Sequence, residues 1–155
     1  MELRAHHLLC IPMYQGHGYS EEFCAHMVKV IERIRTTDEE IRPLSSPDEV
    51  CSHCPNLEPP VPEQEGSRGA KPESENPFLF HRYCEHENRT SKKDSNLLES
   101  FGLRCGKTYS RRELKETVLS HMTQEVFDAS CGKCDWRKQG LCSFELWQKN
   151  FRECF

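Results

Sequence analysis

Apolar positions repeat every three or four residues over a long segment near the start of the chain. Ser20 precedes this segment as an N-cap, and the helix that it opens should run to about Thr36. One face of this helix is apolar and is expected in the core: Phe23, Met27, Val30, Ile31 and Ile34. Residues 4–14 are apolar enough for a shorter helix, which Pro12 and the turn at 15–18 would close.

Further helices are predicted in the second half of the chain. The pattern places them at about 91–101, 110–122, 123–129 and 143–151. Gly102 is a stop signal for the first of them, and Ser110 with Glu113 forms a capping box that opens the second. Residues 41–44 favour a short extended segment instead. The sequence therefore predicts a mostly α fold of short helices with one minor β element.

Between residues 57 and 80 the hydrophobic pattern disappears. Prolines lie there among Glu, Ser, Gly and Lys, with few apolar residues before Phe78. Such a composition buries too little apolar surface to order itself, so we expect a mobile loop or insertion at 57–80. The chain has 155 residues, which is enough for one hydrophobic core. We therefore predict a single cysteine-rich domain over 1–155.

Cysteine spacing is the strongest chemical signal in the chain. Six of the ten cysteines form two similar triplets, each a C-x-x-C pair followed by a third cysteine: Cys51, Cys54, Cys84 and Cys131, Cys134, Cys142. Two residues between cysteines let one turn direct both sulfurs at the same ion or cluster. The chain starts without a basic leader and apolar run, so we expect a cytoplasmic protein with reduced thiols. Metal binding is then favoured over disulfides.

Two kinds of metal site fit this spacing. Structural zinc is often held by four thiolates, which would leave two of the six cysteines without a role. Thiolates also hold the irons of a 4Fe–4S cluster, and Pro55 follows Cys54 as proline follows a ligand cysteine in bacterial ferredoxins. The prediction is that the six cysteines bind an iron–sulfur cluster, with zinc as the alternative. Either one site draws on both pairs, or two sites take one triplet each, with Cys10 or a histidine completing one of them.

His6, His7 and Cys10 form an H-H-x-x-C motif inside the first predicted helix. At spacings of three and four residues, either histidine shares a helix face with Cys10. Imidazole and thiolate together can bind a metal, or act as base and nucleophile, so these three are candidate catalytic residues. The alternative is structural, with Cys10 packed inward and a histidine in solvent.

The other cysteines and one tryptophan have simpler interpretations. Three cysteines stand alone and are predicted to be small buried hydrophobes: Cys24, Cys105 and Cys154. Trp136 follows Cys134 by two residues, where it either shields a cluster from water or packs as an ordinary core aromatic.

Charge and hydropathy argue against two classes of partner. The formal net charge is −4 and acidic and basic residues are mixed, so no basic face for nucleic acid is expected. No apolar run reaches the length of a membrane-spanning helix. A redox or protein partner is expected, and the sequence does not identify it.

Several motifs, taken in order, match a known family. They are R-A-H-H-L-L-C at 4–10, G-H-G-Y-S at 16–20, C-S-H-C-P at 51–55 and C-G-K-C-D-W at 131–136. In this order they resemble the domain-of-unknown-function 1284 family, and the resemblance spans nearly the whole chain. His17 departs from the lysine that the family often has, and the proline-rich stretch before Cys84 looks longer than usual. The resemblance implies an iron–sulfur protein and supplies no reaction.

Three functions follow from these observations. The first is an iron–sulfur protein with a redox, electron-transfer or sensing role. The second is a metalloenzyme, in which an incompletely ligated cluster or a second metal near His6, His7 and Cys10 acts as a Lewis acid. The third is a zinc-stabilised interaction module whose partner docks on the 57–80 loop.

Overall fold

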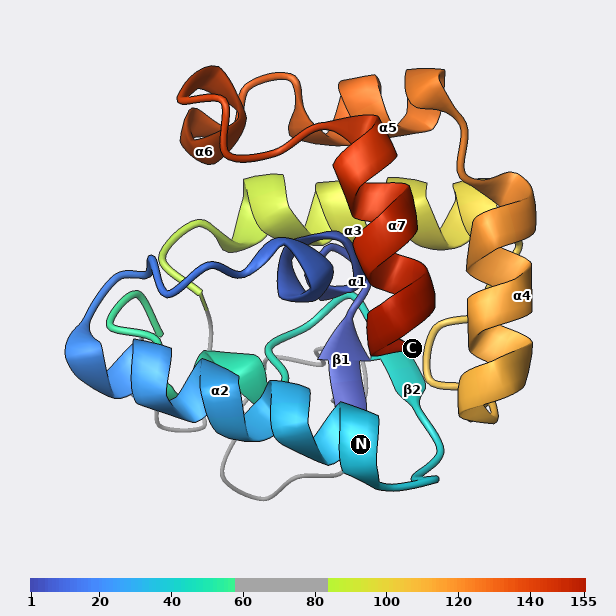
Figure 1. Cartoon of the computed structure of the whole chain (residues 1–155), viewed down its shortest axis with the longest axis horizontal. Coiled ribbons are helices and arrows are strands. Elements are labelled where there is room, and N and C mark those ends of the chain that lie inside the picture. The colour runs from blue at the N-terminus through green and yellow to red at the C-terminus, as the bar shows by residue number, and fades with distance from the viewer. Residues whose placement is uncertain (58–83) are drawn as a thin grey trace, which may run out of the picture.

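A small parallel sheet lies at the centre of the structure, a computed structural model that describes residues 1–57 and 84–155 (Figure 1). Strand β1 (Glu2–Arg4) pairs with β2 (Arg42–Leu44), with Leu3 opposite Pro43. A bridge between Ile41 and Tyr109 joins this sheet to the second half of the chain. The predicted loop at 57–80 lies outside the described residues, apart from Leu57.

Helices surround this sheet, which confirms the mostly α prediction and the single small domain. They are α1 (His7–Cys10), α2 (Glu21–Thr36), α3 (Glu87–Phe101), α4 (Arg111–His121), α5 (Gln124–Cys131), α6 (Asp135–Lys138) and α7 (Phe144–Cys154), with the 3₁₀ turns η1 (Ile11–Met13) and η2 (Val50–His53). Four of the longer helices have an N-cap hydroxyl that accepts a hydrogen bond from a backbone N–H group of the first turn. The capping residues are Ser20, Ser110, Thr123 and Ser143. None of the described helices is long and apolar enough to cross a membrane.

The start of the chain differs from the prediction of one helix over 4–14. Residues 2–4 form a strand, and α1 has only one turn before Pro12 continues the chain as η1. The strand forms because Leu3 and Arg4 find both backbone partners and burial beside β2, which local periodicity does not reveal. Helix α3 also begins earlier than expected, at Glu87, and ends as predicted before Gly102, whose φ is 66°.

The core is built from α2, α7 and the N-terminal segment. All five predicted α2 residues are buried. Trp147 of α7 is fully buried, and its Nε1 donates a hydrogen bond to the carbonyl oxygen of Leu8 at 3.3 Å. Four phenylalanines pack in series with it: Phe127, Phe144, Phe151 and Phe155. Helix α7 therefore covers α1 and η1 (Figure 1) and fixes the position of the N-terminal motif.

Arg4 is a fully buried cation that joins the sheet to α3. Its Nε donates to Asp94 Oδ2 at 2.7 Å, and both terminal nitrogens bond Glu87, at 3.0 and 3.2 Å. A further bond runs to the carbonyl oxygen of Ser45 at 2.9 Å. Burial lowers the pKa of Arg4, but the attraction of Asp94 and Glu87 outweighs it and the net pKa is raised. The guanidinium of Arg4 therefore stays charged in the interior, where each of its nitrogens has a hydrogen-bond partner.

Replacing Asp94 tests how much this network stabilises the fold. Asp94→Asn leaves Arg4 buried without its fully buried counter-ion, so the free energy of unfolding should fall by about 3 kcal/mol. Asp38→Asn is the matched control, because Asp38 pairs with Arg111 at 3.3 Å while almost fully exposed, and should change little. Urea denaturation of both variants measures the difference. Equal effects would contradict the assigned role of the Arg4 network.

Candidate metal centres

Four cysteines from separate segments surround one pocket. Cys10 comes from the end of α1 and Cys131 from the end of α5, while Cys134 and Cys142 precede α6 and α7. We call these residues the four-thiol group. The pKa of Cys10 is raised to about 12, first by burial and then by Cys131 and Cys134. The thiols therefore lie within electrostatic reach of one another.

The 131–142 segment turns back on itself to present three of these sulfurs. The Cys134 N–H bonds the carbonyl oxygen of Cys131 at 3.0 Å, which closes the C-x-x-C turn. The Leu141 N–H bonds the carbonyl oxygen of Trp136 at 3.1 Å, and Gly140 takes a φ of 75° between them. This turn places Cys142 beside the pair.

Two cations line the same pocket. Lys93 comes from α3 and Arg137 from α6. The pKa of Cys131 and of Cys142 is raised to about 11, first by burial and then by neighbouring thiols. Lys93 and Arg137 act in the opposite direction at both thiols. The pocket thus combines soft sulfur donors with positive charge that favours their thiolate form.

Cys51, Cys54 and Cys84 form a separate group, which we call the three-thiol group. Cys51 and Cys54 lie at η2, where the Cys54 N–H bonds the carbonyl oxygen of Cys51 at 2.9 Å. An antiparallel bridge between Leu57 and Cys84 brings the third cysteine alongside. Burial raises the pKa of Cys54, and Cys84 adds to that rise. The six predicted ligands therefore divide between two places, and the structure brings Cys10 to the second triplet.

Tyr19 is a largely exposed residue within electrostatic reach of both groups. Its pKa is raised to about 12, first by burial and then by four cysteines that belong to both groups: Cys10, Cys54, Cys84 and Cys134. Its ring packs 5.2 Å from that of Phe23 and 6.4 Å from that of Trp136, measured between centroids. The Tyr19 hydroxyl is therefore a protonated hydrogen-bond donor near both sets of sulfurs.

The two histidines of the N-terminal motif are each held by a buried carboxylate. His7 Nδ1 lies 2.6 Å from Asp48 Oδ2, and His6 Nδ1 lies 2.7 Å from Asp94 Oδ1. Their ring centroids are 4.2 Å apart. Burial would raise the pKa of Asp48, but His7 and the backbone N–H groups of Arg4 and Cys51 lower it to about 2. An ionised carboxylate accepts a hydrogen bond from an Nδ1–H group, so in both rings Nε2 is the nitrogen that the carboxylate does not hold.

His7, Asp48 and Cys51 also make the tightest set of donor atoms among the described residues. One ligand atom from each lies within 4.8 Å of the other two, and all three residues are buried. Such a group can hold a metal ion. Asp48 was not predicted as a site residue, because the S-P-D-E segment suggests an exposed helix cap. Its one sequence signal is an acid three residues before a C-x-x-C pair.

Asp94 is the second functional residue that sequence reasoning missed. It precedes Leu97 and Leu98 by three and four residues, so it shares the buried face of α3. An acidic residue on an otherwise apolar helix face was the sequence signal that could have identified Asp94.

The H-H-x-x-C motif is divided between these environments. Its histidines meet Asp94 and Asp48, whereas Cys10 faces the four-thiol group. No hydrogen bond joins Cys10 to either histidine in the part of the chain that the structure describes. Because it has no partner base and shares a pocket with three other thiols, Cys10 suits a metal ligand better than a free nucleophile.

The isolated cysteines only partly follow the prediction of burial. Cys154 is buried, and Cys24 is half-buried with its thiol 3.7 Å from the carbonyl oxygen of Gly16. Cys105 is exposed, so the prediction was wrong there. It lies in a short turn after α3, where its sulfur is 3.9 Å from Ser45 Oγ.

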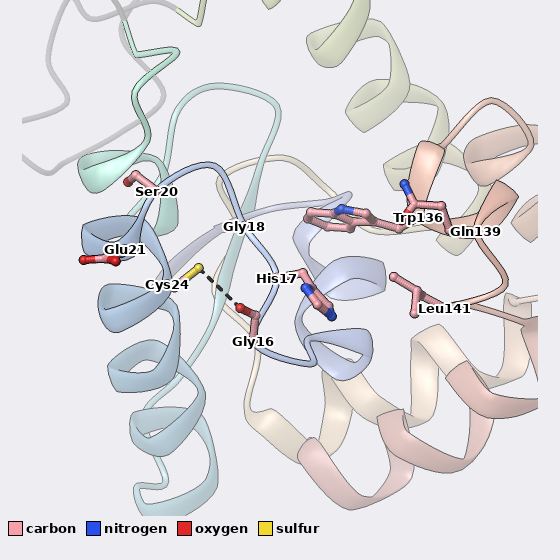
Figure 2. Close-up of a pocket in the computed structure, with 9 residues that line it drawn as sticks. All are labelled: Gly16, His17, Gly18, Ser20, Glu21, Cys24, Trp136, Gln139 and Leu141. Atoms are coloured by element: carbon pink, nitrogen blue, oxygen red, sulfur yellow. Dashed lines mark hydrogen bonds between the residues drawn. The ribbon is translucent and has the colours of Figure 1, made fainter.

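An open cleft of about 410 Å³ adjoins the four-thiol group (Figure 2). His17, Trp136 and Leu141 line both the cleft and the thiol pocket, so they form the wall between them. Gly18 lets the loop approach α2, since a Cβ there would lie 2.7 Å from Cys24 Sγ. The cleft gives solvent a route to this wall, in which Trp136 is half-buried.

A comparison with family models matches residues 18–140 to the family described as "Protein of unknown function (DUF1284)". The chain belongs to this family. The match runs from Gly18 to Gly140 and so includes the three-thiol group and the second C-x-x-C pair. Comparisons with curated proteins and with solved structures each returned no match. DUF1284 membership thus agrees with a cysteine-rich protein. It assigns no chemistry, so the function has to be argued from the geometry of the site.

The burial of His6 should make this DUF1284 protein sensitive to mild acid. Burial first, and then His7, lower the pKa of His6 to about 4, despite the opposing attraction of Asp94. The unfolded chain has the ordinary histidine pKa of about 6.5 and takes up the proton first, so stability falls as pH drops from about 6.5 to about 4. The loss should approach about 1 kcal/mol per pH unit.

Denaturation midpoints measured at several pH values test this expectation. His6→Gln keeps a polar side chain without the titration, so its curve should be flatter over the same interval. His121→Gln is the control, because His121 lies exposed at the end of α4. An unchanged slope in His6→Gln would show that another group causes the acid sensitivity.

Proposed function

We propose that this protein binds an iron–sulfur cluster of the 4Fe–4S type at Cys10, Cys131, Cys134 and Cys142, and uses it in electron transfer or redox sensing. The convergence of four thiols from distant parts of the chain around one pocket carries this proposal. Four cysteine thiolates are the usual ligand set of such a cluster. When bound, the cluster supplies a centre that accepts and releases one electron.

The spacing of the sulfurs favours a cluster over a single zinc ion. Zinc holds thiolates at about 2.3 Å, so tetrahedral ligands lie roughly 3.8 Å apart. Among the described residues, which include all ten cysteines, three donor atoms approach within 4.8 Å of one another only at His7, Asp48 and Cys51. The sulfurs of the four-thiol group therefore lie farther apart than the ligands of a single zinc ion, which favours a cluster whose thiolates bind separate irons.

The residues around the thiols suit a buried anionic cofactor. Leu9, Met13 and Trp136 line the pocket and limit the access of water. Lys93 and Arg137 offset the negative charge of four thiolates. Shielding and nearby cations are two means by which proteins set cluster potentials.

Metal analysis of variants tests the proposal. Wild-type protein purified without oxygen should contain iron and acid-labile sulfide and show visible absorption that dithionite bleaches. Cys134→Ser with Cys142→Ser, both half-buried positions, should lose the cluster of the four-thiol group. Cys24→Ser with Cys105→Ser removes two thiols outside both groups and is the matched control. Colourless wild-type protein with stoichiometric zinc would refute the iron–sulfur assignment.

Lys93 should raise the reduction potential of this cluster. Lys93→Met removes a cation that faces three of the four thiols, so the midpoint potential should fall by about 50 mV, the order expected for one partly screened charge. Lys92→Met changes an exposed neighbour on the same helix and should leave the potential unchanged. Redox titration followed by visible absorption measures both. The same potential in both variants would exclude this role for Lys93.

A further inference from the structure

The three-thiol group differs from the four-thiol group in its number of sulfurs. Cys51 and Cys54 share a turn, and the Leu57–Cys84 bridge supplies the third thiol. All ten cysteines lie in the described residues, and the remaining ones serve the four-thiol group or stand elsewhere. Four sulfurs close the ligand shell of a cluster, whereas three leave one position open.

The surroundings of the three-thiol group include polar groups that keep spare hydrogen-bonding capacity among the described residues. A ring nitrogen of His7 lies within 4.8 Å of a sulfur, that of Cys51. Asp48 holds Nδ1 of the same imidazole, and Nε2 makes no hydrogen bond in the part of the chain that is described. The Tyr19 hydroxyl lies within electrostatic reach of Cys54 and Cys84. A closed structural site would have no need of such groups at its edge.

We propose that Cys51, Cys54 and Cys84 hold a second iron–sulfur cluster, separate from the first, whose open iron position binds a small ligand through an oxygen or sulfur atom. This inference rests on the proposed function, because it extends the same metal chemistry to the other thiol group. It also deepens that function, since a closed cluster transfers electrons while an open one binds a ligand directly.

Buried charges of both signs surround the three-thiol group. Arg4 is in electrostatic contact with Cys51, while Asp48 and Glu87 accept the backbone N–H bonds of Cys51 and Cys84. Asp48 also orients the imidazole of His7, one ring nitrogen of which lies within 4.8 Å of Cys51 Sγ. A small ligand that binds iron through oxygen or sulfur and forms a hydrogen bond with His7 matches these surroundings.

Paired variants separate this centre from the first. Cys54→Ser with Cys84→Ser changes two half-buried thiols of the three-thiol group, just as Cys134→Ser with Cys142→Ser changes two of the four-thiol group. Each pair should lose about half of the iron and sulfide of anaerobic wild-type protein and keep the rest. Circular dichroism checks that both variants fold.

Cyanide, a small anionic ligand of iron, probes the open position. Added to reduced protein, it should shift the electron paramagnetic resonance signal of the wild type and of Cys134→Ser/Cys142→Ser. The signal of Cys54→Ser/Cys84→Ser should not shift. If cyanide leaves the electron paramagnetic resonance signal of every variant unchanged, the proposal of an open iron position is refuted.

The outcomes for the two centres are distinguishable. If Cys54→Ser/Cys84→Ser keeps all of its iron, the second centre is refuted while the proposed function stands. If either pair of changes removes all of the iron, the two thiol groups make one site and the inference fails. If Cys54→Ser/Cys84→Ser does not fold, the iron content of the wild-type protein decides between one cluster and two. Two clusters require about eight irons per chain and one requires about four.

Discussion

Two buried carboxylates, Asp48 and Asp94, set the position of the N-terminal segment, and both thiol groups depend on that segment. Asp48 accepts backbone hydrogen bonds from Arg4 at 2.6 Å and from Cys51 at 3.0 Å, so it joins β1 directly to the first C-x-x-C turn. Asp94 accepts from the backbone of His6 at 2.8 Å and from the Arg4 side chain. With these bonds in place, α1 has one orientation, and Cys10 at its end reaches the four-thiol group.

This arrangement would couple folding to the metal binding that we propose. The chain has few apolar residues for its length, and its two-stranded sheet is too small to stabilise the fold alone. Ligands that come from α1, α5 and the segment before α7 cannot be held together in an unfolded chain. A bound metal would therefore add its binding free energy to that of folding. The buried Arg4 pairs supply specificity, since they cost desolvation unless every partner is present.

The sequence predicted those features that depend on residues close together in the chain. Periodicity and caps located α2, α4 and α7 to within a few residues, because those signals lie inside the element itself. The strand at 2–4 was missed because its partner lies about forty residues away. Cysteine spacing identified each C-x-x-C turn but left open whether Cys10 or a histidine completes a triplet, because that depends on how α1 packs against α7. The histidine–carboxylate pairs were invisible for the same reason, since they join residues 41 and 88 positions apart.

The three-thiol group also shows how one site can tolerate a long intervening segment. Cys54 and Cys84 are separated by 58–83, yet the Leu57–Cys84 bridge and the bond from Glu85 N–H to the carbonyl oxygen of Asn56, at 2.9 Å, fix both ends together. Glu87 adds a bond to the Cys84 N–H at 3.0 Å while it holds Arg4. Because these contacts set the geometry locally, the position of Cys84 does not depend on the length between the ends. A proline-rich insertion at this point can therefore vary without moving a thiol.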